Sequence, residues 1–291
     1  MPLFPLAGRT PLRLLPNCSE RFGCEVYGKL EIYNPTGTHK DRESEEIMKH
    51  ALRKGVFKSA IASTGNAAIS LAAYSYICGI ECHVYVPRTI APDRMSQIQA
   101  YDPIISQSDT YDKAIAECQA VAERESYLNC NPGARPEKVN GDQAIGSEIA
   151  KKQKWTYVVC PTNNGTLLAG VWRGLRKSGS KTKMVASVAR HTKLAEGIAG
   201  FHRFERDALS AAMKQSKGII VEVSDREISE AARILVTDGL IVEGAAAAAV
   251  AALKQLKLST KSRVCCVITG TGLKVPASVR ELLGSGPRIM E

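Results

Sequence analysis

The stretch Asn34-Pro-Thr-Gly-Thr-His-Lys40-Asp-Arg-Glu43 lies where the hydrophobic pattern of the chain changes. Before it, residues 26–33 alternate between apolar and polar side chains, which is typical of a strand. After it, residues 44–54 carry the pattern of an amphipathic helix. The stretch therefore predicts a strand, a Pro-Thr-Gly turn and a helix whose first turn holds Lys40.

The position of Lys40 suggests a chemical role for its amine. An amine at the start of a helix feels the positive end of the helix dipole, which disfavours the protonated form. We therefore expect a lowered pKa for Lys40. An unprotonated lysine can act as a nucleophile toward a carbonyl group, so the sequence raises the question of a carbonyl cofactor.

Strand and helix patterns alternate along most of the chain on both sides of this stretch. Further strand patterns lie at residues 59–62, 81–86, 103–106, 156–160, 184–188, 218–223 and 263–268. Strands that alternate with helices through short links predict parallel sheets covered on both faces. With 291 residues, the chain is long enough for one large or two modest α/β domains with mostly parallel sheets. If there are two domains, the loop-rich segment 133–140 is where we expect the chain to cross between them.

Composition excludes several classes of protein. No apolar run reaches the roughly 18 residues that a membrane-spanning helix needs, and the first residues lack the layout of a signal peptide. The nine cysteines include no CxxC pair and no cluster with histidines. We therefore expect buried, reduced thiols, no metal site, no membrane partner and a cytoplasmic location.

The net charge of +10 is compatible with nucleic acid or with small anionic ligands. The basic residues are spread along the chain, and no aromatic RNA-binding pattern or zinc-finger spacing accompanies them. We therefore expect no nucleic-acid partner. A solvated basic face accounts for most of these charges.

Three loops that follow predicted strands have the character of anion or ligand sites. Ser63-Thr64-Gly65-Asn66 offers hydroxyl and backbone donors that suit a carboxylate. Pro161-Thr162-Asn163-Asn164-Gly165-Thr166 is a candidate phosphate nest, although it is not a Walker A loop. Thr269-Gly-Thr-Gly272 places a hydroxyl at a strand end. Taken alone, the first loop favours a plain capped helix start, the third favours a glycine-rich turn, and the signal of the second is weak. His39 is the one histidine near Lys40, with a structural or exposed role as the alternative.

These motifs, in this order, resemble those of the fold type II pyridoxal-phosphate enzymes. That family includes tryptophan synthase β subunits, cysteine synthases, serine and threonine dehydratases, and threonine synthases. The resemblance runs from Gly8-Arg-Thr-Pro-Leu12 to Thr269-Gly-Thr-Gly-Leu-Lys274 and covers essentially the whole chain.

The resemblance implies a role for each motif, with pyridoxal 5'-phosphate as the cofactor. Lys40 matches the catalytic lysine that carries the cofactor. The positions that match cofactor contacts are Asn66 at the ring hydroxyl, Thr162, Asn163, Asn164, Gly165 and Thr166 at the phosphate, and Thr269 at the pyridine nitrogen. Those that match substrate contacts are Ser63, Thr64, Gly65 and Asn66, with His39 beside them. A neutral hydroxyl at the ring nitrogen favours elimination and replacement chemistry.

Within the family, the threonine synthase group is the nearest resemblance. Residues 267–274 resemble its C-terminal motif, and residues 223–230 and 242–244 resemble other parts of it. The implied activity is that of a lyase that converts O-phosphohomoserine to threonine and phosphate. Serine or threonine dehydration, β-replacement and a non-catalytic binding role stay open, because His39 stands where the family usually has an aromatic residue.

The resemblance also implies two three-layer α/β/α domains with mostly parallel sheets, and an assembly. Residues 1–45 and 135–291 would form a large cofactor-binding domain, and residues 46–134 a small domain for the substrate carboxylate. The family's usual assembly implies a homodimer, and the substrate would be a small amino acid, possibly phosphorylated.

Overall fold

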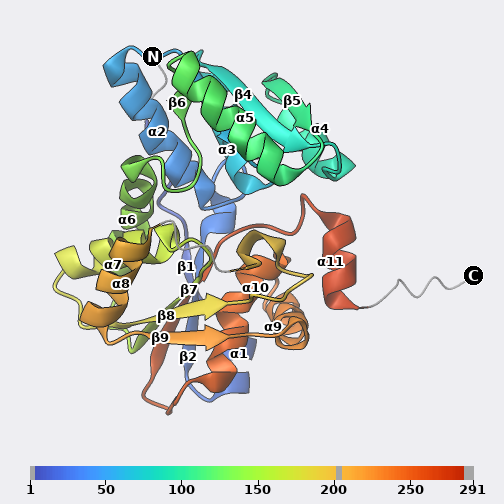
Figure 1. Ribbon diagram of the computed structural model, residues 1–291. Helices are drawn as coiled ribbons and strands as arrows, with labels where there is room; N and C mark the ends of the chain where they lie inside the picture. Colours follow the sequence, from blue (N-terminus) through green and yellow to red (C-terminus); the bar gives the residue numbers. More distant parts are fainter. Residues whose placement is uncertain (1–3, 201–204, 285–291) are drawn as a thin grey trace, which may run out of the picture. The chain divides into compact units, whose positions relative to one another are not determined.

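A computed structural model describes residues 4–200 and 205–284, which form two compact units, each built around one sheet (Figure 1). One unit takes its described residues from Met1–Gly8 and Tyr33–Ala144, and the other from Arg9–Ile32 and Ile145–Glu291. Among the described residues, no helix is long and apolar enough to cross a membrane. The nine cysteines are free, and all except the partly exposed Cys78 are buried, which confirms the expectation of buried thiols.

The smaller unit is built on a four-stranded parallel sheet in the order β5-β4-β3-β6. Its strands are β3 (Lys58–Ala62), β4 (Glu81–Pro87), β5 (Ile104–Ser108) and β6 (Leu128–Asn129). Its helices are α2 (Lys40–Lys54), α3 (Asn66–Cys78), α4 (Pro92–Gln99) and α5 (Tyr111–Arg124). Along β3, Ile61 packs with α2 and α3, whereas Ala60 and Ala62 pack with α5. Because alternate side chains of a strand point to opposite faces, this unit has three layers.

The larger unit is built on a six-stranded sheet in the order β1-β2-β10-β7-β8-β9, in which only the β1–β2 pair is antiparallel. Its strands are β1 (Leu12–Leu14), β2 (Glu25–Leu30), β7 (Tyr157–Pro161), β8 (Lys183–Val188), β9 (Ile219–Glu222) and β10 (Arg263–Ile268). Its helices include α1 (Pro16–Phe22), α7 (Thr166–Lys177), α8 (Arg206–Ser216), α9 (Asp225–Thr237), α10 (Gly244–Ala251) and α11 (Pro276–Leu283).

Both faces of the larger sheet are covered by helices. On β7, Val158 and Cys160 pack with α7 and α8, whereas Val159 packs with α9 and α10. The alanines of α10 allow it to lie close to the sheet, and Ser187 of β8 donates a 2.7 Å hydrogen bond to the carbonyl of Ala248. The predicted α/β class, with three-layer units and mostly parallel sheets, is therefore confirmed.

Two local predictions were wrong. The strand predicted over 26–33 ends earlier, because β2 stops at Leu30 and Glu31–Tyr33 forms a 3-10 turn. The segment 133–140 is not simply a loop, since helix α6 (Pro136–Ala150) begins within it. Proline is favourable in the first turn of a helix, and Glu137 follows it there. Pro136, which lies in the segment predicted as loop-rich, is instead a helix start.

The predicted domain limits stay a prediction, and their ends at residues 1–3 and 285–291 lie outside the described residues. The two units divide the chain differently in three places, because residues 4–8, 33–45 and 135–144 fall in the smaller unit. For residues 33–45 the reason is that α2 packs on α3: Ile47 and Met48 share a buried cluster with Leu71 and Ala72. The helix that carries Lys40 is thus held by the smaller unit.

Within this unit, Gly141 of α6 allows the close approach of α6 to the first turn of α2. A Cβ atom added at Gly141 would lie 2.3 Å from the carbonyl oxygen of Arg42 and 2.9 Å from the amide nitrogen of Glu43. Both neighbours are backbone atoms, which cannot move aside as a flexible side chain could. Any residue other than glycine must therefore push the two helices apart.

We predict that Gly141→Ala lowers the free energy of unfolding by about 1–3 kcal/mol, because the added methyl group overpacks this contact. Urea unfolding followed by circular dichroism measures the change. The matched control is Asn140→Ala on the exposed side of α6, which should be neutral or slightly stabilising because alanine is the better helix former. Equal stability of Gly141→Ala and the wild type would contradict the close contact.

Candidate active site

A tight turn delivers Lys40 to the start of α2. The amide of Gly37 donates to the carbonyl of Asn34 at 2.8 Å, and Gly37 has a positive φ of 75° that favours glycine. Asp41 accepts two hydrogen bonds from Thr36, one from its amide at 2.6 Å and one from its hydroxyl at 2.5 Å. The helix begins at Lys40, as predicted, so the turn fixes the position of the lysine backbone.

The amine of Lys40 is paired with a buried carboxylate on the same helix. The Nζ atom of Lys40 lies 2.5 Å from Oε1 of Glu43. The side chain of Glu43 is only 3% exposed, and that of Lys40 is 20% exposed. Because the two residues are three positions apart on a helix, their side chains lie on the same face.

This pair overturns the predicted pKa of Lys40. Burial of the amine acts to lower its pKa, but the charges of Glu43 and Asp142 and the hydrogen bond to Glu43 outweigh burial. The pKa of Lys40 is therefore raised above its usual 10.5. The helix dipole is equivalent to about half a charge, whereas Glu43 brings a full charge at 2.5 Å. In the free protein the amine is an ammonium ion.

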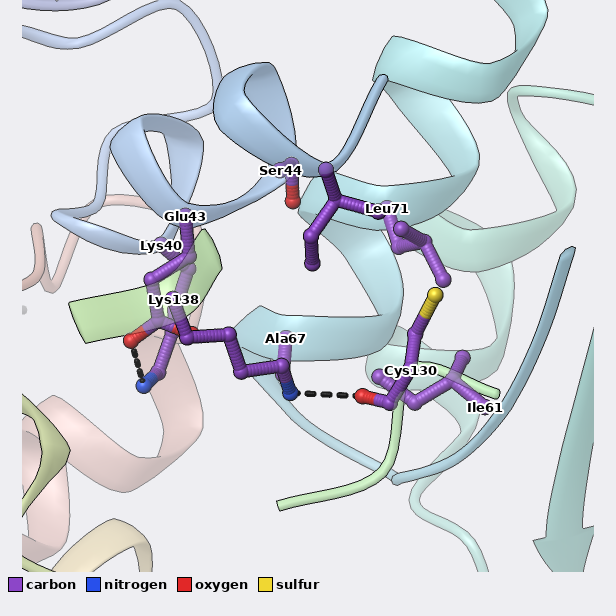
Figure 2. Close-up of a pocket in the computed structure, with 9 residues that line it drawn as sticks. Lys40, Glu43, Ser44, Ile61, Ala67, Leu71, Cys130 and Lys138 are labelled. Carbon is purple, nitrogen blue, oxygen red and sulfur yellow. Dashed lines mark hydrogen bonds and ion pairs between the residues drawn. The ribbon is translucent and has the colours of Figure 1, made fainter. Parts of the chain in front are cut away.

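Helix α6 brings a second lysine and a second carboxylate to the same place. Lys138 is 4% exposed and donates a 2.5 Å hydrogen bond to the carbonyl of Cys130. Burial is the main cause that lowers the pKa of Lys138, and the positive charge of Lys40 adds to it. Figure 2 shows Lys40, Glu43 and Lys138 beside one small cavity. The rest of its lining is Ser44, Ile47, Ile61, Ala67, Leu71 and Cys130.

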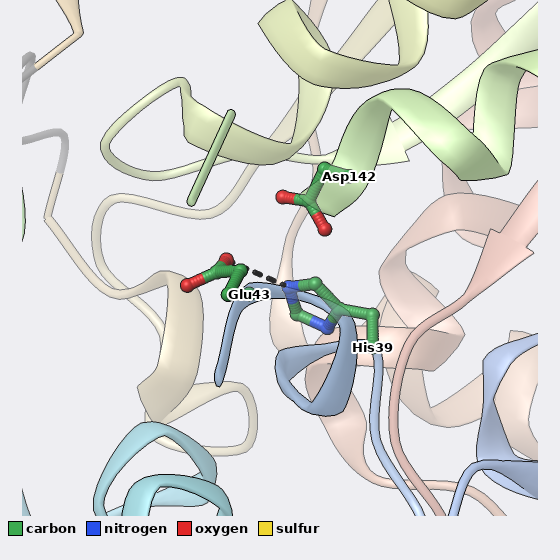
Figure 3. Close-up of side chains that lie close together, drawn as sticks. All are labelled: His39, Glu43 and Asp142. Carbon is green, nitrogen blue, oxygen red and sulfur yellow. Dashed lines mark ion pairs between the residues drawn. The ribbon is translucent and has the colours of Figure 1, made fainter. Parts of the chain in front are cut away.

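His39, Glu43 and Asp142 converge at the start of α2 (Figure 3). One nitrogen or oxygen atom from each lies within 4.8 Å of the other two, and His39 Nε2 is 3.8 Å from Glu43 Oε1. Burial acts to raise the pKa of Glu43, but the charges of Lys40, Lys138 and His39 outweigh burial and hold this pKa below its usual 4.5. Two lysines thus balance the two carboxylates, and the group is an ion cluster centred on Glu43.

The loop at residues 63–66 lies in the same unit as Lys40 and precedes α3. The hydroxyl oxygen of Ser63 accepts a 3.3 Å hydrogen bond from the backbone amide of Gly65. Asn66 is the first residue of α3. Nη1 of Arg94 donates to Oδ1 of Asn66 at 3.4 Å. A Cβ atom added at Gly65 would meet nothing within 4 Å. The open space over Gly65, together with the first-turn amides of α3, suits a small carboxylate.

The loop at residues 162–166 lies in the larger unit, between β7 and α7. Thr162 makes two hydrogen bonds. Its backbone amide donates to the carbonyl of Ser187 at 2.7 Å, and its hydroxyl donates to the carbonyl of Cys160 at 2.9 Å. The side-chain amide of Asn163 donates a hydrogen bond to the carbonyl of Ala199. The side-chain oxygen of Asn164 accepts a 3.1 Å hydrogen bond from the backbone amide of Thr166. Gly165, with a φ of 92°, precedes the 12-residue helix. These contacts hold the loop in one conformation.

The hydroxyl of Thr166 is buried and has no hydrogen-bond partner, although the residue is only 1% exposed. Leaving a buried hydroxyl unpaired costs free energy, and this one stands in the first turn of α7, where backbone amides also lack acceptors. An anion with several oxygen atoms would satisfy both kinds of donor. Thr269, 5% exposed, follows β10 in the same unit, as predicted.

The structure thus places Lys40, His39 and residues 63–66 in one unit, and residues 162–166 and Thr269 in the other. The sequence prediction missed Glu43, Lys138 and Asp142 as parts of the site. Lys138 and Asp142 are four residues apart, which puts them on one face of a helix, but Lys138 lies in the segment predicted as loop-rich and Asp142 just beyond it, where no helix was predicted. Glu43 ends the motif that holds Lys40, and neither the turn nor the helix pattern indicates a role for its carboxylate.

A family profile described as "Pyridoxal-phosphate dependent enzyme" matches residues 3–270 of the chain. The threonine synthase of Halalkalibacterium halodurans is 29% identical, and the match covers 99% of this chain and 89% of that protein. The threonine synthase of a Bacillus species is 31% identical, with 93% and 84% covered.

Solved structures show the same fold. The processed form of threonine deaminase isoform 2 from Solanum lycopersicum superposes with a TM-score of 0.83 at 21% identity, covering 97% of this chain and 85% of that one. An O-ureido-L-serine synthase superposes with a TM-score of 0.84 at 20% identity, covering 99% and 98%.

The unpaired hydroxyl of Thr166 leads to one prediction. Thr166→Val keeps the shape of the side chain and removes the unsatisfied group, so the free energy of unfolding of the ligand-free protein should rise by about 1 kcal/mol. Inorganic phosphate should raise the melting temperature of the wild type more than that of the variant. Thermal melts with and without phosphate measure both effects. A variant that is less stable, and responds to phosphate as the wild type does, would rule out this role for Thr166.

A second prediction concerns acid stability. Because the pKa of Glu43 is lowered in the folded protein, its contribution to stability is fully present above the usual pKa of 4.5 and is lost as the pH falls through the lowered value. Glu43→Gln should cost about 3 kcal/mol near pH 7, and this difference from the wild type should shrink below about pH 4.5. Urea unfolding across the acid range measures it; a difference that does not vary with pH would contradict the ion pair.

Proposed function

Since this chain belongs to the family of pyridoxal-phosphate-dependent enzymes and has pyridoxal 5'-phosphate as its cofactor, we propose that it acts as a threonine synthase. The reaction would convert O-phosphohomoserine to threonine and inorganic phosphate. The observation that carries this proposal is the match to threonine synthases along 84–89% of their own length. Relatives that share nearly all of their chain share the elements from which a substrate pocket is built.

The residues present fit the cofactor. The unpaired hydroxyl of Thr166 and the first-turn amides of α7 supply donors for a phosphate group. Lys40 supplies a partly exposed primary amine for an aldehyde. Asn66 would contact the ring hydroxyl, and Thr269 the ring nitrogen. Thr162, Asn163, Asn164 and Gly165 would complete the phosphate loop.

The cofactor, when bound, supplies an electron sink for the carbanion that forms at Cα of an amino acid. The chain's own residues hold the substrate and move protons. Ser63, Thr64, Gly65 and Asn66 would bind the substrate carboxylate with hydroxyl and amide donors. Lys40 would take the proton from Cα and return protons during the later steps. Because each task needs a fixed geometry, the ordered turn at residues 34–37 is part of the mechanism.

The charge of the site also supports an anionic substrate group. Lys138 is buried next to Lys40 and lines the same cavity. A buried ammonium group attracts a phosphate oxygen strongly, because little water screens it. Glu43 and Asp142 offset part of this charge, so substrates with neutral side chains, such as serine and threonine, are also worth testing.

A homodimer and a cytoplasmic location are also part of the proposal. The dimer rests on the assembly usual in this family, and the location on a chain whose described helices include none that could span a membrane. Light scattering coupled to size-exclusion chromatography measures the mass in solution. A mass close to the 31.4 kDa of a single chain would contradict the dimer.

We predict that the purified protein absorbs at about 410–430 nm, as a lysine-bound pyridoxal cofactor does, and that Lys40→Ala abolishes this band. The matched control is Lys49→Ala on the same helix, which should keep the band. O-phosphohomoserine should yield phosphate and threonine in equal amounts. A phosphate assay and amino-acid analysis measure the two products. Phosphate release without threonine, or turnover of serine, threonine or O-acetylserine only, would favour dehydration or β-replacement instead. A protein without the band would be a binding protein that keeps the fold.

A further inference from the structure

The amine of Lys40 must lose a proton before it can act as a nucleophile. An ammonium ion has no lone pair to attack a carbonyl group, and the raised pKa of Lys40 leaves little free amine at neutral pH. The site therefore needs a proton acceptor for Lys40. The acceptor in contact with the amine is Oε1 of Glu43, at 2.5 Å.

Water reaches Lys40, whose side chain is 20% exposed, but loss of the proton to water is the costlier route. The cavity beside Lys40, Glu43 and Lys138 measures about 10 Å³, which is the space of a single water molecule. The carboxylate of Glu43 is 3% exposed. Sending the proton to solvent would leave a buried carboxylate without the cation that balances it, which is costly in a poorly hydrated site. Transfer within the pair keeps its net charge at zero.

The structure holds Glu43 in place for this transfer. The helix sets the spacing of Lys40 and Glu43, and the hydroxyl of Ser70 donates to that of Ser44 at 2.8 Å, which joins α3 to the next residue of α2. Gly141 of α6 lies directly against the amide of Glu43. The charged groups around the pair are His39, which directly precedes α2, and Lys138 and Asp142 of α6.

We propose that Glu43 is the proton-exchange partner of Lys40. In this step an Nζ–H bond of Lys40 breaks, an O–H bond forms at the Glu43 carboxylate, and the electron pair stays on Nζ as the nucleophile. The role rests on the proposed function of Lys40 as the cofactor-binding lysine. Glu43 gives the proton back when the amine is released.

The proposal predicts an unusual pH profile for the reactivity of Lys40. While the pair holds one proton, the share of it that exists as neutral amine and protonated Glu43 does not depend on pH. The wild-type rate should therefore be flat at the acid end of a range from about pH 5 to 8.5, and should rise only where the pair itself loses its proton to solvent. In Glu43→Gln the amine must lose its proton to solvent, and its rate should rise about tenfold per pH unit. Trace acetylation of the cofactor-free protein with acetic anhydride, read at the Lys40 peptide by mass spectrometry, measures both rates. A free amino acid in each reaction corrects for reagent loss.

Two variants separate proton exchange from simple electrostatics. Asp142→Asn removes a nearby charge but keeps Glu43, so its profile should stay flat. Glu46→Gln, the same change at a more exposed site on α2, should match the wild type. If Glu43 acts only through its charge, the wild-type rate will also rise about tenfold per pH unit and lie below that of Glu43→Gln. That result would overturn the proposal.

This experiment is independent of the proposed function, because it uses neither cofactor nor substrate. A flat wild-type profile with a sloped Glu43→Gln profile supports proton exchange even if no visible band forms on addition of pyridoxal 5'-phosphate. Circular dichroism confirms that Glu43→Gln is folded under the labelling conditions. If that variant unfolds, the pH profiles of the wild type and of Asp142→Asn test the proposal without it. Acetylation rates that are flat with pH support the proposal, and rates that rise about tenfold per pH unit throughout overturn it.

Discussion

The close contact between Gly141 and the Arg42–Glu43 peptide is the constraint on which the candidate site depends. It lets α6 lie against the first turn of α2, so that Lys138 and Asp142 reach the charges of Lys40 and Glu43. A side chain at position 141 would separate the helices and leave buried charges unbalanced. The packing of two backbones therefore sets the electrostatics of the site.

The ion cluster changes the chemical character of the lysine. A lysine governed by the helix dipole alone would be a ready nucleophile, whereas Lys40 is stored as an ammonium ion beside a buried carboxylate. Storage in this form fits a residue that must exchange protons as well as form bonds. The unpaired hydroxyl of Thr166 is a second local cost that a bound phosphate would remove. Both features point to a site built for a ligand.

Much of the fold could be predicted because it follows from local patterns. The Pro-Thr-Gly turn, the helix start at Lys40 and the loops after β3, β7 and β10 need only hydrophobic periodicity and turn chemistry. The start of α6 could not be predicted in the same way, since Pro136 is compatible with a loop or a first helical turn. With no helix predicted at residues 136–150, Lys138 and Asp142 could not be assigned to the site.

The sequence by itself determined the α/β class, the order of the motifs and the resemblance to pyridoxal-phosphate enzymes. All of these depend on which residues are near one another along the chain. Only the tertiary structure decided the protonation of Lys40, because the groups that set it come partly from α6, about a hundred residues away in sequence. Burial multiplies the strength of such charges, so the pairing of Lys40 with Glu43, three residues along the same helix, outweighs the helix dipole once folding buries the Glu43 carboxylate.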